Sequence, residues 1–259
     1  MTDLFVESWG AGLRVVLVHG SLATGLEEWQ AQRPLADQGF RLTVFDRRGY
    51  GESPVADGED FLTDADDIVD LIGEGAHLVG HSYGGLGALF AAARHPAATR
   101  SLVLLEPAAF ALGQRSPAAR MLADDVRRLW WQDLPDRDWV IRFLTAVGSD
   151  PDSLSADLIA DAVALVPVCR RGRPAWEAEL PFADLAAAPF PKLVVSGGHS
   201  AAFEAICDDL AERIGASRAV VEGAGHEVQF AGPPLNNLLH AFWSAASLPA
   251  AGVASIFAG

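Results

Sequence analysis

The stretch His77-Leu-Val-Gly-His-Ser-Tyr-Gly-Gly85 decides the fold of this chain. Its first residues are a short apolar run, and a helical pattern of small and apolar residues follows from Gly84 to Arg94. Between them stands Gly80-His-Ser-Tyr-Gly84, a G-x-S-x-G pattern in the strand, sharp turn and helix context that such a motif requires. The turn would expose the Ser82 hydroxyl, and glycine at both flanking positions would let strand and helix approach closely.

Other apolar runs of the same kind surround this motif. They lie at 14–18, 42–45, 102–105, 193–195 and 219–221. Continuous apolar runs of four to eight residues are typical of strands that are buried on both faces of a parallel sheet. Helical patterns at 64–72 and 202–214 alternate with them, which predicts an α/β protein with a mostly parallel sheet.

One long segment interrupts this alternation. Between residues 107 and 189 we find no strand pattern, whereas apolar residues recur at helical spacing around 122–130, 140–147 and 158–166. We therefore expect a core made of residues 1–106 and 190–259, with a helical cap of three or four helices at 107–189. We expect one or two of its tryptophans to line a substrate cavity and the others to pack the cap; they are Trp130, Trp131, Trp139 and Trp176.

Composition excludes several classes of function. The chain has 259 residues, half of them hydrophobic, and 34 acidic against 19 basic residues give a formal charge of −15. Such an acidic chain is a poor partner for nucleic acid or for anionic membranes. Two cysteines argue against a disulfide scaffold and fit a reduced cytoplasm. The first ten residues contain Asp3 and Glu7 but no Lys or Arg, so we expect no secretory signal. No apolar run approaches the roughly 18 residues of a membrane span, since Glu106 interrupts the longest candidate, so we expect no membrane span.

Four motifs in this order resemble the α/β-hydrolase family over nearly the whole chain. Besides the Ser82 motif they are His19-Gly-Ser21, Asp46-Arg-Arg-Gly-Tyr-Gly-Glu-Ser53 and Gly223-Ala-Gly-His226. The resemblance implies an α/β-hydrolase fold with Ser82 as nucleophile and His226 as general base. It also implies an oxyanion hole formed by the backbone N–H groups of Ser21 and Tyr83.

The acid of the expected triad departs from the most common family pattern. The loop Ser196-Gly-Gly-His-Ser-Ala-Ala202 contains no carboxylate, where most members place an aspartate. Glu106 ends the strand after the nucleophile helix, a position that haloalkane dehalogenases and zearalenone lactone hydrolases use. We therefore expect Glu106 to orient His226, with a Ser–His dyad or Asp208 as the alternatives.

These residues predict a serine hydrolase that cleaves a small, partly apolar ester or lactone without a cofactor. The histidines show no metal-ligand spacing, so we expect no metal. The other readings are a C–C bond hydrolase, a thioesterase, a cofactor-free haloperoxidase, or a catalytically silent ligand-binding member of the fold. We expect a small-molecule substrate and a cytoplasmic location. The sequence leaves open whether the chain forms a homo-oligomer, and it leaves the tail Leu248–Gly259 unexplained.

Overall fold

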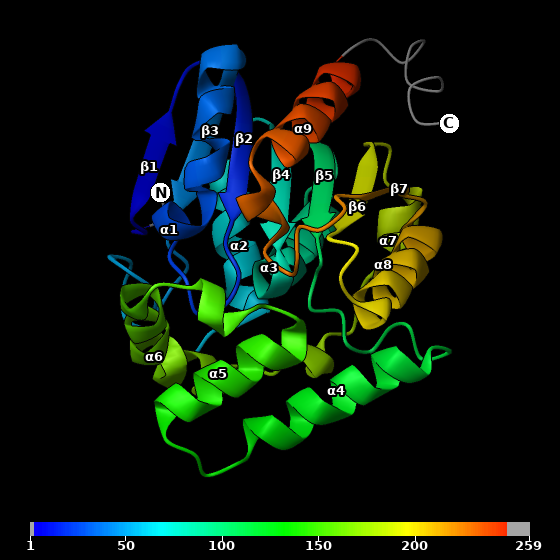
Figure 1. The fold of residues 1–259 in the computed structure, drawn as a ribbon. Coiled ribbons are helices and arrows are strands. Elements are labelled where there is room, and N and C mark those ends of the chain that lie inside the picture. Colours follow the sequence, from blue (N-terminus) through cyan, green and yellow to red (C-terminus); the bar gives the residue numbers. More distant parts are fainter. Residues whose placement is uncertain (1–2, 248–259) are drawn as a thin grey trace.

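The computed structural model describes residues 3–247, which form a seven-stranded sheet flanked by helices (Figure 1). The tail from residue 248 onward, which the sequence left unexplained, lies outside the described residues. Strand order across the sheet is β1-β3-β2-β4-β5-β6-β7. The strands are β1 (Val6–Trp9), β2 (Leu13–Val18), β3 (Phe40–Phe45), β4 (Ala76–His81), β5 (Thr99–Leu105), β6 (Lys192–Ser196) and β7 (Ser217–Val220).

Strands β2 to β7 pair in parallel, and only β1 runs antiparallel to its neighbour β3. The register aligns the carboxyl ends of the central strands, because His81 pairs with Leu105 and Leu105 pairs with Val195. The residues that follow β4, β5 and β6 therefore emerge together at one edge of the sheet. Ligand sites of doubly wound sheets lie at this edge.

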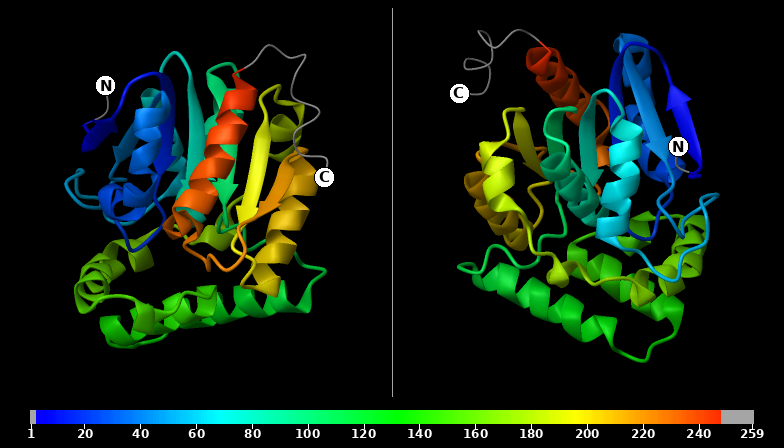
Figure 2. Two further views of the ribbon diagram at one scale, coloured as in Figure 1. Left: turned by 45° about the horizontal axis from the view of Figure 1, so that its top comes forward. Right: turned by 180° about the vertical axis from the view of Figure 1, so that it is seen from behind.

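Both faces of the sheet are buried, which explains why its strands read as unbroken apolar runs. In β2, Val16 and Val18 belong to one core and Val15 and Leu17 to the other. The first core contains α2 (Phe61–Ile72), α3 (Ser82–Arg94) and α8 (Ala201–Ile214); the second contains α1 (Gly25–Trp29), the 3₁₀ helix η1 (Gln30–Gln38) and α9 (Pro233–Ala246). Figure 2 shows these two sets of helices on opposite faces.

The mostly parallel sheet is confirmed, whereas strand β1 and the helices α1, η1 and α9 were not predicted. Strand β1 has only four residues, and Glu7 and Ser8 interrupt its apolar character, so it lacks the signature of a central strand. As an edge strand it needs to bury little. Helix α9 begins with Pro233 and Pro234, which suit the first turn of a helix but obscured the pattern in the sequence.

A layer of helices lies across the carboxyl edge of the sheet (Figures 1 and 2). It consists of α4 (Pro117–Trp130), α5 (Asp136–Val147) and α6 (Ala156–Arg171), all inserted between β5 and β6. The short α7 (Phe182–Ala187) follows them and contacts α3 and α8. A functional division into a core and a cap at residues 107–189 remains our proposal. Within residues 3–247, no helix has both the length and the apolar character needed to cross a bilayer.

A buried arginine ties the loops at this edge together. The guanidinium of Arg47 is fully buried and pairs with Glu59 at 2.9 Å and with Asp64 of α2 at 2.8 Å. It also donates to the backbone carbonyls of His19 and Gly20, at 3.0 and 2.8 Å. Because Arg47 joins the loop after β2 to the loop after β3, its loss would leave two buried carboxylates without a cation.

We predict that Arg47→Met lowers the free energy of unfolding by about 3–5 kcal/mol, because it leaves buried charges uncompensated. The matched control is Arg94→Met. Arg94 of α3 forms an exposed ion pair with Asp66, which lies on α2 as Asp64 does, and the variant breaks this pair. That variant should lose less than about 1 kcal/mol. Urea denaturation followed by circular dichroism measures both, and equal losses would contradict the structural role given to Arg47.

Candidate active site

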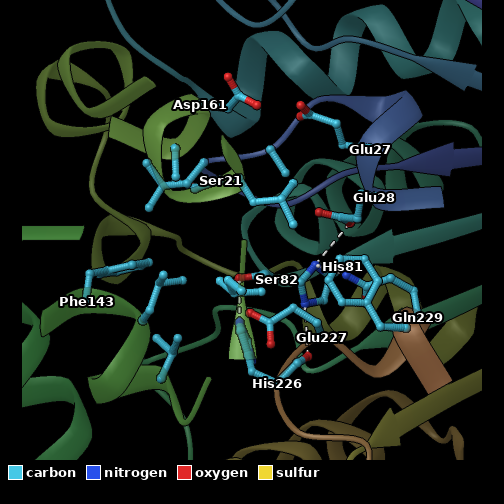
Figure 3. A pocket seen from close by; sticks show the side chains of 18 residues that line it. Ser21, Glu27, Glu28, His81, Ser82, Phe143, Asp161, His226, Glu227 and Gln229 are labelled. Atoms are coloured by element: carbon cyan, nitrogen blue, oxygen red, sulfur yellow. Dashed lines mark hydrogen bonds and ion pairs between the residues drawn. The ribbon is translucent and has the colours of Figure 1, made fainter. Parts of the chain in front are cut away.

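Ser82 stands on a strained turn between β4 and α3. Its φ angle is +49°, in the left-handed region that residues other than glycine rarely adopt. The flanking glycines are required by space: a Cβ on Gly84 would lie 2.1 Å from the carbonyl oxygen of His19, and one on Gly80 would lie 2.8 Å from Ala88 Cβ. The turn places the Ser82 side chain in a cavity at the carboxyl edge of the sheet (Figure 3).

The structure brings Ser82, His226 and Glu106 into one hydrogen-bonded chain. Ser82 Oγ lies 3.1 Å from His226 Nε2, and His226 Nδ1 lies 2.8 Å from Glu106 Oε2. Since the carboxylate can only accept, Nδ1 carries the ring hydrogen and Nε2 is free to accept the Ser82 proton. Like Ser82, Glu106 has a positive φ angle, +38°, where the chain turns off the end of β5.

A second histidine shares the Glu106 carboxylate. His199 Nε2 lies 3.1 and 2.9 Å from the two carboxylate oxygens, and the backbone N–H of Gly197 donates to Oε1 at 2.8 Å. Both residues belong to the loop after β6, where most relatives would carry the acid. In this chain the loop supplies donors to a carboxylate from β5. In the sequence, only its place in that loop distinguishes His199.

These donors decide the charge of Glu106. Burial alone would raise the pKa of this carboxyl, but the hydrogen bonds from His199 and His226 outweigh it and lower the pKa from 4.5 to about 2. The pKa of His199 is raised: its partial burial works against this, but the hydrogen bond to Glu106 prevails. Glu106 is therefore ionised throughout the neutral range.

The same three side chains form a group whose donor atoms could hold a metal ion. The ligand atoms of Glu106, His199 and His226 lie within 4.8 Å of one another. Two histidines and a carboxylate are a familiar ligand set for zinc and other transition metals. A cation bound there would replace the Nδ1–H hydrogen bond that orients His226, so it would compete with the triad geometry.

The predicted oxyanion residues flank the nucleophile. Tyr83 follows Ser82 in the first turn of α3, and Ser21 lies with both of them in the wall of one small cavity. Gly20 packs directly against Ser82, since a Cβ built on it would be 3.1 Å from Ser82 Cβ. The side chains point to other partners: Ser21 Oγ donates to Glu59 at 2.9 Å, and Tyr83 Oη donates to the Arg173 carbonyl at 2.7 Å. Their backbone N–H groups remain our candidates for the oxyanion hole.

A buried pair behind the nucleophile was not predicted. Glu28 of α1 accepts from the Gly20 N–H at 2.9 Å and lies 3.1 Å from His81 Nδ1. His81 Nε2 in turn lies 3.1 Å from the backbone carbonyl of His226. Burial lowers the pKa of His81, but the effect of the neighbouring Glu28 carboxylate is opposite and larger. The net shift of the His81 pKa is therefore upward. This pair connects the loop after β2 with the loop that carries His226.

Two cavities meet at Ser82. The larger has a volume of about 140 Å³, and its wall includes His226, His81, Phe143 and Leu158 (Figure 3). The smaller has a volume of about 20 Å³, and its wall includes Tyr83, Phe110, Trp130 and Trp176. A reacting group could therefore extend from Ser82 in two directions.

Of the four cap tryptophans predicted to be candidates for the substrate cavity, only Trp130 and Trp176 reach one. Trp131 directly follows α4, and 71% of its surface is exposed to solvent. Trp139 is fully buried between α4 and α5, where its ring stacks on Phe143 and its Nε1 donates to the Leu129 carbonyl at 3.1 Å. Helical periodicity could not separate these roles, because it shows which residues face a neighbour but not which neighbour is a cavity.

Glu28 and Glu59 are the residues of this edge that sequence reasoning missed. Glu28 lies beside Glu27 in the first turn of α1, where acidic residues are common because they stabilise a helix start. Glu59 precedes α2 in a polar loop. Neither residue stands in a distinguishing local pattern. The one feature that could have indicated them is that each follows a strand, β2 or β3, that ends at the active-site edge.

Comparison with solved structures supports the fold. The chain matches a thermophilic esterase from Thermogutta terrifontis with a TM-score of 0.72 and 24% identity, covering 95% of this chain and 94% of that one. It also matches an α/β hydrolase from Sphaerobacter thermophilus with a TM-score of 0.70 and 26% identity, covering 93% and 96% of the two chains.

Sequence comparison finds relatives over shorter stretches. A non-heme chloroperoxidase from Kitasatospora aureofaciens is 44% identical over 89 residues, 32% of each chain. A pimeloyl-[acyl-carrier protein] methyl ester esterase from Methylococcus capsulatus is 38% identical over 103 residues, 39% of this chain and 40% of that protein. The matches thus span about a third to two fifths of these curated relatives.

A family model covers far more of the chain. The model described as the alpha/beta hydrolase family matches residues 15–235, which include all four motifs and every residue of the Ser82–His226–Glu106 chain. Together with the parallel sheet and the strained turn at Ser82, this match shows that the chain belongs to the α/β hydrolase family.

Proposed function

We propose that this protein is a serine hydrolase that cleaves a small carboxylic ester or lactone through an acyl-enzyme on Ser82. The observation that carries the proposal is the continuous chain from Ser82 Oγ through both ring nitrogens of His226 to Glu106, with distances of 3.1 and 2.8 Å. A nucleophile, a base and an orienting acid within hydrogen-bond distance of one another are the elements of nucleophilic acyl transfer.

The tautomer of His226 supports its role as general base. Nε2 faces Ser82 and accepts its proton as Oγ attacks the carbonyl carbon of the ester. The imidazolium that forms is stabilised by Glu106, which the low pKa of about 2 keeps ionised. His226 then donates the proton to the leaving alcohol, and the alcohol departs to leave an acyl group on Ser82.

Hydrolysis is completed by water. His226 takes a proton from the water, the hydroxide attacks the acyl carbonyl, and Ser82 leaves with the proton that His226 returns. In both steps the negative oxygen would be stabilised by the backbone N–H groups of Ser21 and Tyr83. No residue in this scheme calls for a cofactor, and the helices α4 to α6 would shield the intermediate from bulk water.

Ester hydrolysis is favoured by the relatives as well. The names of two relatives, the methyl ester esterase from Methylococcus capsulatus and a bifunctional esterase/perhydrolase from Acinetobacter calcoaceticus, include esterase activity. The serine nucleophile separates this chain from members of the fold that use an aspartate. A lactone is an internal ester, so the same steps would open one. We keep esters and lactones together as the substrate class.

We predict that Ser82→Ala loses about 10⁶-fold in turnover of p-nitrophenyl acetate, as removal of the nucleophile does in other serine hydrolases. The wild type, but not the variant, should be labelled stoichiometrically by a fluorophosphonate. Ser244→Ala, at an exposed position of α9, is the matched control and should behave as wild type. A Ser82→Ala protein that keeps a tenth of the activity would rule out the covalent mechanism.

We predict that Glu106→Gln lowers turnover by about 10⁴-fold, because the amide cannot stabilise the imidazolium and can favour the wrong His226 tautomer. Asp208→Asn is the control and also tests the alternative acid. Asp208 lies on α8, where its exposed carboxylate pairs with Arg218 at 2.9 Å, so its loss should change turnover less than twofold. The reverse order of effects in steady-state kinetics would move the acid to Asp208.

We predict that Glu106 also makes stability depend on pH in the acidic range. Its pKa in the folded protein is about 2, below the usual 4.5, so the ionised carboxylate stabilises the fold above pH 4.5 and this contribution fades as the pH falls toward 2. Between pH 5 and pH 3, the wild type should lose roughly 2 kcal/mol more unfolding free energy than Glu106→Gln. Urea denaturation at both pH values measures this difference, and parallel pH curves would show that Glu106 is not held by these donors.

A further inference from the structure

The positions of the two cavities relative to His226 distinguish the two halves of an ester. His226 lies in the wall of the larger cavity, whereas the wall of the smaller one contains Ser82, Ser21 and Tyr83 but not His226. The leaving oxygen must lie near His226 Nε2, because that atom returns the proton to it. The alcohol half therefore occupies the larger cavity, and the acyl half occupies the smaller one, whose small volume of about 20 Å³ favours a short acyl group.

The larger cavity carries negative charge that no lysine or arginine in its wall offsets. Its wall includes the carboxylates of Glu27, Asp161 and Glu227 and contains no lysine or arginine. Within residues 3–247, none of the three takes part in an ion pair; Glu27 caps α1 through Thr24, and Glu227 accepts from the Ser149 hydroxyl. The fourth carboxylate, Glu28, is paired with His81.

The smaller cavity provides the contrast. The one carboxylate in its wall is Glu59, which is buried against the Arg47 guanidinium at 2.9 Å. Its charge is therefore compensated within the protein. Next to Ser82, carboxylates without an ion-pair partner therefore line the larger cavity and not the smaller one.

Apolar and aromatic side chains separate the distant carboxylates from the nucleophile. Figure 3 shows Asp161 and Glu27 at one end of the cavity, with Ser82, His226 and Glu227 toward the other. Leu22, Leu144 and Leu158 belong to the wall, as do the rings of Phe143 and Phe230. Carboxylates combined with aromatic rings are the groups that attract an alkylammonium ion, the rings through cation–π contacts.

We propose that the larger cavity selects an alcohol half that carries a positive charge, so that the preferred substrate is a short-acyl ester of an ammonium-bearing alcohol. This inference rests on the proposed ester hydrolysis and specifies its substrate class. An alkylammonium group at the far end of the cavity would face Asp161 and Glu27, while the carbons that join it to the ester oxygen would pass along the apolar wall.

The test uses two isosteric acetates, 2-(trimethylammonio)ethyl acetate and its neutral carbon analogue 3,3-dimethylbutyl acetate. Their hydrolysis by the wild type is followed by pH-stat at low ionic strength. We expect kcat/KM to be about tenfold higher for the cationic ester, with the difference mainly in KM. Added salt at about 0.5 M should reduce the ratio, because Glu27 and Asp161 are solvent-exposed and their charges are screened. Equal values, or a preference for the neutral ester, would overturn the proposal.

Variants locate the effect. The double variant Glu27→Gln/Asp161→Asn should lower the cationic-to-neutral ratio of kcat/KM about four- to tenfold, since an exposed carboxylate contributes about two- to fivefold. Its control is Asp70→Asn/Asp66→Asn, which removes two charges from exposed positions of α2. This control should leave the ratio unchanged. If both doubles reduce the ratio equally, the preference comes from net charge and the cavity assignment is wrong.

Binding separates this inference from the proposed function. Calorimetry with Ser82→Ala measures the affinity of both acetates without turnover. Tighter binding of the cationic ester that is lost when Glu27→Gln and Asp161→Asn are added would support the cavity assignment. This support would hold even if the wild type hydrolysed neither ester. Failure to hydrolyse either ester would refute only the proposed function. Equal binding of the two esters would overturn the inference whatever the hydrolysis assays show.

Discussion

The arrangement at this edge of the sheet depends on the buried carboxylate of Glu106. A lone buried carboxylate would be costly, and here three N–H donors satisfy it: the rings of His226 and His199 and the backbone of Gly197. The carboxylate thereby joins the end of β5 to the loop after β6 and to the loop that carries His226. One charged group fixes both the tautomer of the proposed base and the relative position of three loops.

A second buried pair acts on the other side of the nucleophile. Glu28 holds the Gly20 N–H, which precedes the proposed oxyanion donor, and His81 reaches the backbone carbonyl of His226. His226 is thus held through its ring by Glu106 and through its backbone by His81. Because the Ser82 turn is strained, with φ of +49°, such external support is what keeps the nucleophile and base aligned.

The charge distribution gives the site a direction. Buried carboxylates such as Glu106, Glu28 and Glu59 all have partners, whereas Glu27 and Asp161, which have no ion-pair partner, lie at the far end of the larger cavity. Fields from exposed charges are screened by salt but are focused in a cavity with apolar walls. A small part of the acidic charge, which the sequence shows only as a total, therefore lies beside the cavity proposed to admit the alcohol.

The sequence by itself determined the mostly parallel sheet and indicated the residues of the proposed triad, because apolar strand runs, the glycines around Ser82 and the carboxylate at Glu106 are local patterns. Only the tertiary structure decided that His199 and Gly197 hold Glu106, that Glu28 pairs with His81, and that Trp130 and Trp176 reach a cavity while Trp131 and Trp139 do not. The same holds for the separation of the two cavities and the gathering of Glu27, Asp161 and Glu227 around one of them. The physical reason is that these contacts arise where separate loops converge. The hydrogen bonds among them join residues that are 53 to 93 positions apart in the sequence. No local periodicity records such convergence.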